Sequence, residues 1–224
     1  AENISDAGTK SDTLEYSLMR ARLEVYYEVI PSNSLRLFQS KFDKDPNDAN
    51  TYGLALAHQK NNNYEKSINL LDKLIKKYPK NLVINTTKVD ILTAFGNYSD
   101  ALILVDKFLE ISPKNYPLSI SKSKLLLAMK SYFESEEIIR DQLLRKNDDP
   151  ELWLLLSEIQ RNSQNILGYH QSRAEYYLLL GQDEQALNQL EFALKMTQNN
   201  FQASERIMTK IVDIKKDLGE SRGL

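Results

Sequence analysis

Apolar residues recur along the chain at intervals of three and four, the spacing of one face of an α-helix. Near the N-terminus, Leu14, Leu18, Ala21 and Val25 fall on one such face. Pro31 is expected to end this first helix, because its ring removes a backbone donor and clashes with the preceding turn. A second helix is predicted at about residues 34–42, so the chain opens with a degenerate helix pair.

A longer period of 34 residues is superimposed on the helical spacing. Tyr64, Tyr98 and Tyr132 follow one another at that step, each just after a turn and at the start of a helical pattern. Two columns of small or β-branched residues keep the same step: Ser67, Ala101 and Ser135, and Ala55, Val89, Ser123 and Ser157. Self-similarity at this period is typical of stacked helix–turn–helix units.

Each column has an expected role in packing. We expect the tyrosines to be buried at the junctions between helices. The small residue of each first helix should let the second helix approach closely, and the small residue of each second helix should admit the first helix of the next unit. Gly96 suits a left-handed turn between two helices.

The pattern changes phase after residue 150. Ala174 comes half a repeat after Ser157, so the helix at about residues 166–180 is expected to serve two neighbours, with Ala174 and Ala186 both buried. A last helix is predicted to cover the end of the array, because open ends of stacked repeats need a cap. Its apolar edge could alternatively dock on another domain.

The predicted fold class is all-α: a right-handed α-solenoid of helix pairs with a C-terminal capping helix. Residues 1–11 are expected to form a flexible tail or linker, and residues 12–218 the solenoid. Within the solenoid we expect a degenerate repeat at 12–46, regular repeats at 48–149, phase-shifted repeats at 150–200 and the capping helix at 201–218. Residues 219–224 are predicted to be a disordered C-terminus.

Trp153 and Leu156 match the W-x₂-L spacing that opens the tetratricopeptide consensus. With the 34-residue columns, they make the chain resemble the tetratricopeptide repeat (TPR) family over most of its length. The resemblance implies a protein-binding array whose first helices line a groove. It assigns the groove lining to Tyr52, Leu56, Gln59, Thr86, Asp90, Thr93, Ile120, Lys124 and Leu127.

That lining mixes apolar side chains, polar side chains and charges of both signs, which suits an extended peptide or a protein edge. The basic clamp that some TPR domains use for a C-terminal carboxylate is not evident, since Lys124 alone does not make one. Any one of the nine positions could instead be an ordinary solvated or half-buried residue.

A narrower resemblance rests on residues 11–23, 170–181 and 182–194. These stretches are similar to the C-terminal TPR region of bacterial M48-family zinc metallopeptidases of the β-barrel assembly-enhancing type. The resemblance implies a periplasmic protein in which a signal peptide and a zinc peptidase domain precede the repeats. It also implies contacts with the outer-membrane β-barrel assembly complex and its clients. The alternative is a free-standing TPR scaffold or adaptor, for which a cytoplasmic location stays open.

Charge and composition narrow the function classes. Lys and Arg number 29 against 31 Asp and Glu, for a net charge of −2, which argues against nucleic-acid binding and polybasic membrane attachment. No apolar run approaches the ~18–20 residues of a membrane span. The chain has no cysteine, so disulfides and thiolate metal sites cannot form. It begins with Ala, which we interpret as a piece of a longer chain.

No catalytic constellation is visible. The H-E-x-x-H helix of zinc peptidases is missing, so no catalytic residue carries over, and zinc is expected only on the absent peptidase domain. His58 is expected to pack in the core, and His170 to bond a nearby backbone group or face water. Adjacent Glu136 and Glu137 point to different faces of a helix. We predict that this segment is not an enzyme and holds no cofactor.

Overall fold

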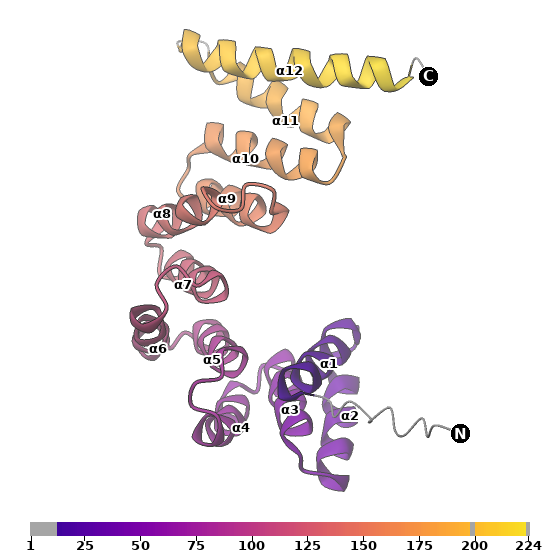
Figure 1. The fold of residues 1–224 in the computed structure, drawn as a ribbon, viewed down its shortest axis with the longest axis vertical. Helices are drawn as coiled ribbons and strands as arrows, with labels where there is room; N and C mark the ends of the chain where they lie inside the picture. The colour runs from indigo at the N-terminus through magenta and orange to yellow at the C-terminus, as the bar shows by residue number, and fades with distance from the viewer. Residues whose placement is uncertain (1–12, 198–199, 223–224) are drawn as a thin grey trace, which may run out of the picture. The chain divides into compact units, whose positions relative to one another are not determined.

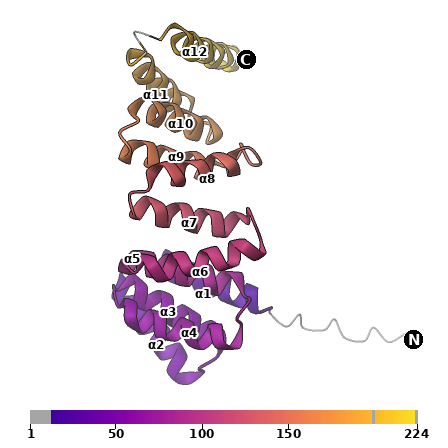
Figure 2. The same ribbon diagram turned by 90° about the vertical axis from the view of Figure 1, so that its left-hand side faces the viewer.

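The computed structural model describes residues 13–197 and 200–222. Within them the chain forms twelve α-helices and no strand (Figure 1, Figure 2). The helices are α1 Leu14–Tyr27, α2 Pro31–Lys44, α3 Asp48–Lys60, α4 Tyr64–Lys77, α5 Leu82–Phe95, α6 Tyr98–Ile111, α7 Tyr116–Ala128, α8 Tyr132–Leu143, α9 Pro150–Asn162, α10 Ile166–Leu179, α11 Asp183–Lys195 and α12 Phe201–Arg222. The predicted all-α class is confirmed. The predicted tail at residues 1–11 lies outside the described residues.

The chain divides into two compact units, at Val105 and Asp106 within α6. In the first unit, α1 and α2 both pack against α3, α3 packs against α4, and α4 packs against α5. In the second, each helix from α7 to α11 packs against the next helix along the chain. The domain boundaries predicted from the sequence stay a prediction.

Two further columns at the 34-residue step shape the helix ends. Asn47, Asn81, Asn115 and Asp149 are the N-caps of α3, α5, α7 and α9, and each side chain accepts a hydrogen bond from a backbone N–H of its helix. These bonds satisfy amide groups that would otherwise lack a partner at the start of a helix. In the turns that follow these four helices, Asn62, Gly96, Lys130 and Gln164 adopt positive φ angles of 59° to 85°. The left-handed turn predicted for Gly96 is confirmed.

The columns of small residues are buried, as predicted. Ser67, Ala101, Ser135, Ala55, Val89 and Ser123 have no exposed surface, and Ser157 almost none. Their partners differ from the expectation, however. Ser67 Oγ donates to the Ala55 carbonyl at 2.7 Å, and Ser135 Oγ donates to the Ser123 carbonyl at 2.8 Å. The small residue of the second helix therefore faces the first helix of its own unit.

The tyrosine column departs from the prediction, because Tyr64, Tyr98 and Tyr132 are only half-buried. Each is the first residue of its helix, beside the turn, so its ring reaches the rim of the core. Tyr64 shows the arrangement: its ring centroid lies 5.6 Å from that of Phe95, and its hydroxyl donates to Asn62 Oδ1 at 3.0 Å. The tyrosines therefore pack beside the turn between two helices, and the small residues are the ones that fill the helix crossings.

Two predicted helix ends differ from the structure. α2 begins at Pro31 instead of near residue 34, because proline at the first helical position lacks only an N–H that would have no intrahelical partner anyway. The last helix continues to Arg222, beyond the end predicted at residue 218. Residues 219–222, predicted to be disordered, are thus helical, and 223–224 lie outside the described residues.

The phase shift has the predicted explanation. α10 packs against both α9 and α11, and it lies between them in Figure 1 and in Figure 2. Ala174 and Ala186 are both fully buried. They share an apolar cluster with Ile207, Ile211 and Ile214 of α12. The last helix therefore covers α11 as a cap.

Candidate functional site

Three of the nine predicted groove residues are buried: Tyr52, Leu56 and Thr86. Tyr52 has no exposed surface because α1 lies against α3. Arg22 of α1 donates to the Tyr52 hydroxyl from Nε at 3.0 Å and from Nη2 at 2.5 Å. The same Nη2 donates to Thr87 Oγ1 of α5 at 2.5 Å. In this repeat the first helix of the chain occupies the place expected for a ligand.

A recess remains beside this contact, with a cavity volume of about 290 Å³. Three of the predicted groove residues line it: Leu56, Gln59 and Asp90. The other lining residues are Arg22, Val25, Tyr26, Lys60 and Thr87. Lys60 Nζ holds the C-terminal end of α1 by donating to the Val25 carbonyl at 2.6 Å and the Tyr26 carbonyl at 3.2 Å. The recess thus combines apolar walls with charges of both signs.

The outer face of α1 carries an apolar strip. Tyr26 and Tyr27 are 73% and 74% exposed, and the strip continues along the helix through Leu23, Met19 and Tyr16. Isolated exposed apolar residues are ordinary, but a contiguous patch marks an interaction surface. The spacing in the sequence indicates this second apolar face, because Tyr16, Met19, Leu23 and Tyr26 recur at intervals of three and four residues, opposite the buried stripe. The stripe of Leu14, Leu18, Ala21 and Val25 predicts the helix, but it does not predict this exposed strip.

The remaining groove residues are more accessible. Asp90 and Lys124 are exposed, and Gln59, Thr93, Ile120 and Leu127 are half-buried. The Thr93 hydroxyl donates a hydrogen bond to the Val89 carbonyl of its own helix, at 2.8 Å. Ile120 and Leu127 of α7 pack on the core of the second unit. Binding by these positions stays a prediction.

The two histidines lie in different surroundings. His58 is buried in α3, as predicted, and this burial lowers its pKa, which nearby Lys66 lowers further. His170 differs from the prediction: its Nδ1 is 2.8 Å from Gln189 Oε1 of α11, and its ring stacks on Phe192 with centroids 5.4 Å apart. Among the described residues, no three His, Asp or Glu side chains gather as a metal site would require.

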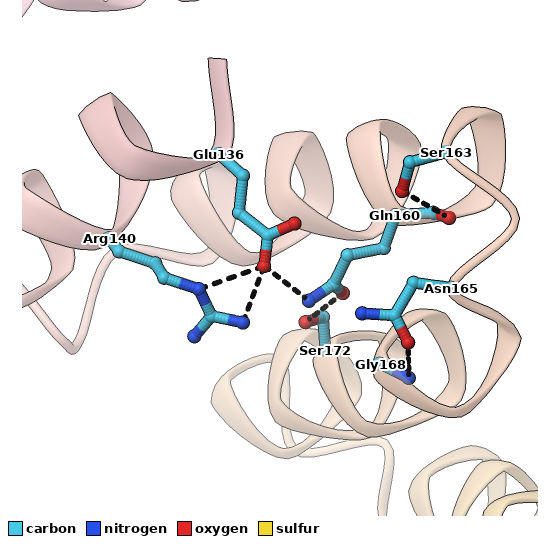
Figure 3. Close-up of polar contacts among 7 residues, drawn as sticks. All are labelled: Glu136, Arg140, Gln160, Ser163, Asn165, Gly168 and Ser172. Atoms are coloured by element: carbon cyan, nitrogen blue, oxygen red, sulfur yellow. Dashed lines mark hydrogen bonds and ion pairs between the residues drawn. The ribbon is translucent and has the colours of Figure 1, made fainter. Parts of the chain in front are cut away.

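A polar network joins α8, α9 and α10 in the second unit (Figure 3). Arg140 donates to Glu136 Oε1 from Nε at 2.8 Å and from Nη2 at 2.6 Å. Gln160 Nε2 donates to the same oxygen at 3.3 Å, and Ser172 Oγ donates to Gln160 Oε1 at 2.7 Å. Gln160 and Ser172 are buried. The network holds side chains from three helices in one arrangement.

Gly168 allows the network to form. A Cβ atom built on Gly168 would lie 2.6 Å from Asn165 Nδ2 and 2.8 Å from Gln160 Nε2. Real carbon atoms do not approach that closely, so a side chain here would push the buried amide of Gln160 out of place. Asn165 meanwhile caps α10 by accepting from the Gly168 N–H at 3.0 Å. The 34-residue repeat does not predict this cluster, because its residues share no repeat column.

An all-α array of helix pairs with a 34-residue period, small residues at the helix crossings and a capping helix defines the class of repeat solenoids built from TPR units. No helix in the part of the chain described combines the length and apolar character needed to cross a membrane.

Solved structures agree with that class. The chain is similar to a tetratricopeptide repeat protein from Parabacteroides merdae ATCC 43184, with 15% identity, a TM-score of 0.54 and coverage of 88% of this chain and 84% of the other. TTC0263, a TPR protein of Thermus thermophilus, gives 18% identity, a TM-score of 0.53 and coverage of 88% and 98%. MamA from Desulfovibrio magneticus RS-1 gives 13% identity, a TM-score of 0.50 and coverage of 82% of this chain and 96% of the other. These likenesses show the fold alone.

Comparisons by sequence add no relative: no known family profile matches the chain, and no curated protein matches it.

Proposed function

We propose that this chain is a protein-interaction module that holds a partner on the first unit. The observation that carries the proposal is the apolar strip on α1, which runs from Tyr16 to Tyr27 and meets the recess at Tyr26. Large, rigid aromatic side chains that remain exposed beside a recess are the usual anchors of a protein interface.

The recess suits a short stretch of extended chain. Its Leu56 and Val25 can cover an apolar side chain, while Gln59 and Asp90 can hydrogen-bond to backbone or polar groups. Extended peptides are recognised by this combination of apolar pockets and polar contacts. The accessible groove residues of α5, Asp90 and Thr93, are proposed as further contacts. Binding by Ile120, Lys124 and Leu127 of α7, which belong to the second unit, is a separate proposal.

A narrower proposal concerns the parent protein. We propose that the chain is the C-terminal TPR domain of a periplasmic M48-family zinc metallopeptidase. In this proposal the domain brings the peptidase to the outer-membrane β-barrel assembly complex or to misfolded clients. The support is the sequence resemblance of residues 11–23, 170–181 and 182–194. The other candidate is a free-standing TPR scaffold. An H-E-x-x-H helix encoded upstream of Ala1 in the same gene distinguishes the two.

The interaction surface is tested by Met19→Glu, with Met208→Glu as its matched control. The two methionines are 43% and 49% exposed on helices, and only Met19 belongs to the α1 strip. Binding of the purified β-barrel assembly complex to the immobilised chain is measured by biolayer interferometry. Met19→Glu should weaken binding at least about tenfold, the size of one lost interface contact, and Met208→Glu should leave it unchanged.

Two other outcomes would contradict one part of the proposal each. Equal binding by wild type and both variants would exclude the α1 strip as the contact. No binding by the wild type would exclude the assembly complex as the partner and leave the adaptor alternative. In that case, crosslinking of wild type against Met19→Glu would show whether any other protein uses the strip.

A further inference from the structure

A second recess lies in the other unit, above the polar network of Gln160 and Ser172. Its cavity volume is about 290 Å³, near the lower end of the range for ligand pockets. Helices α8 to α12 all contribute to its wall. The lining residues are Arg140, Trp153, Leu156, Gln160, Gly168, Gln171, Ser172, Glu175, Leu190, Arg206, Ile207 and Lys210.

Cations predominate among the charged residues of this wall. Arg140, Arg206 and Lys210 stand against the single carboxylate of Glu175. Lys210 pairs with Glu175, and Arg140 pairs with Glu136 at 2.6 Å. Arg206 is exposed and has no ion-pair partner in the part of the chain that the structure describes. One positive charge at the mouth of the recess is therefore left uncompensated.

The wall also holds more hydrogen-bond donors than acceptors. Arginine has five N–H groups, and Arg140 directs two of its nitrogens at Glu136, while Arg206 makes no hydrogen bond within the described residues. The buried amide of Gln160 has two N–H groups, of which the contact with Glu136 uses one. Its acceptor oxygen is already taken by Ser172. A ligand that fits this wall must bring acceptors, and charged ones fit best.

Hydrogen bonds fix the orientation of two side chains that line the recess, Gln160 and Trp153. Gly168 leaves room for the Gln160 amide, and Ser172 fixes that amide's orientation. The Trp153 indole N–H donates to the Asn147 carbonyl at 2.8 Å, which holds the ring in place. Trp153, Leu156 and Ile207 supply an apolar surface next to the cations.

We propose that this recess binds the side-chain carboxylate of an acidic segment in a partner protein, with an apolar neighbour of that acidic residue against Trp153. Arg206 neutralises the carboxylate, and Gln160 donates a hydrogen bond to it. All the charged lining residues belong to α8, α10 and α12. The groove predicted from the sequence uses α3, α5 and α7. The site is thus separate from the one proposed on the first unit.

The test uses the full chain and a short fluorescein-labelled peptide with a central Asp-Glu-Leu-Asp motif in a Gly-Ser background, amidated at its C-terminus. The control peptide replaces the motif with Asn-Gln-Leu-Asn. Fluorescence anisotropy should show the acidic peptide binding at least about tenfold more tightly, the range for hydrogen bonds to a charged group. Arg206→Gln should remove most of that preference, and Arg206→Glu should abolish it.

Arg161→Gln is the matched control variant, because Arg161 is an exposed arginine of α9 that does not line the recess. It should bind the acidic peptide like the wild type. Equal binding of the acidic and amide peptides, or equal losses in Arg206→Gln and Arg161→Gln, would overturn the proposal. So would a neutral peptide that binds only with a free C-terminal carboxylate, or a recess that takes inorganic phosphate and not the acidic peptide.

Discussion

The backbone of Gly53 in α3 lies against the ring of Phe38 in α2. A Cβ atom built on Gly53 would stand 1.9 Å from Phe38 Cε1 and 2.3 Å from Cδ1. Phe38 is itself buried, with 1% of its surface exposed. Glycine at this position is therefore required by the contact between α2 and α3 and not by its backbone angles.

Gly53→Ala should destabilise the first unit by about 1–3 kcal/mol, because the added methyl group overpacks the junction. Urea unfolding followed by circular dichroism measures the change. The double variant Gly53→Ala with Phe38→Leu should recover part of the loss, since the smaller side chain makes room for the methyl group. Additive losses in the double variant would contradict a direct clash.

Tyr98→Ala tests the revised role of the tyrosine column. A fully buried aromatic residue would cost ~3–5 kcal/mol on truncation to alanine, which is the expectation from the sequence. Because Tyr98 is half-buried, we expect a loss of about 1–3 kcal/mol in the same unfolding measurement. A loss below about 1 kcal/mol would mean that the tyrosine contributes nothing to the turn it closes.

Ala174→Leu tests the helix that serves two neighbours. Ala174 is fully buried in α10, between α9 and α11, so a larger side chain should cost about 1–3 kcal/mol. Ala128→Leu is the control, because Ala128 is an exposed residue near the end of α7, and it should change stability by less than about 0.5 kcal/mol. Similar stabilities for both variants would mean that the helices around α10 move apart and accommodate the larger side chain at little cost.

Asp149 should make stability depend on pH. Burial alone would raise the pKa of Asp149, but hydrogen bonds from the Tyr116 hydroxyl and from Lys146 outweigh it and lower the pKa below its ordinary value. The Tyr116 hydroxyl lies 2.7 Å from Asp149 Oδ2. A carboxyl with a lowered folded-state pKa stabilises the fold above its unfolded pKa of ~4, and that stabilisation is lost as the pH falls through the folded value.

We therefore expect stability to fall between about pH 5 and pH 2, and to fall less steeply in Asp149→Asn, which should also be less stable at neutral pH. Tyr116→Phe should cost about 1–2 kcal/mol at pH 7, because it removes a hydrogen bond to a charged group. Urea unfolding across this pH range checks both. Parallel pH profiles for wild type and Asp149→Asn would exclude Asp149 as a contributor.

The groove residues are tested by exchanging charges at Asp90 and Lys124. Both are exposed, so the double variant Asp90→Lys with Lys124→Glu should change the stability by less than about 1 kcal/mol. Partner binding should weaken by about tenfold or more if the groove carries it. Full binding in this variant, with loss in Ile211→Asp, would move the site to the C-terminal cap. Stoichiometric zinc in the purified chain would contradict a non-enzymatic role.

Much of the fold follows from the sequence alone. The 34-residue step of Ser67, Ala101 and Ser135 predicted which residues are buried where helices cross, because only small side chains permit that approach. The half-repeat spacing of Ser157 and Ala174 likewise predicted a helix with two neighbours. These features depend on contacts between helices that are close in sequence. Because each repeat makes the same contact, the residues that make it recur at a fixed spacing and can be predicted from the sequence.

The candidate binding sites, in contrast, depend on contacts that do not repeat along the chain, so the repeat spacing does not predict them. Arg22 reaches Tyr52 and Thr87, and that contact buries a residue expected to line an open groove. The recess above Gln160 gathers Arg140 and Arg206 from helices far apart in the chain. A repeat pattern shows which face of each helix is apolar, but not which distant helix covers it. That choice is made by the packing of whole helices, and only the tertiary structure shows it.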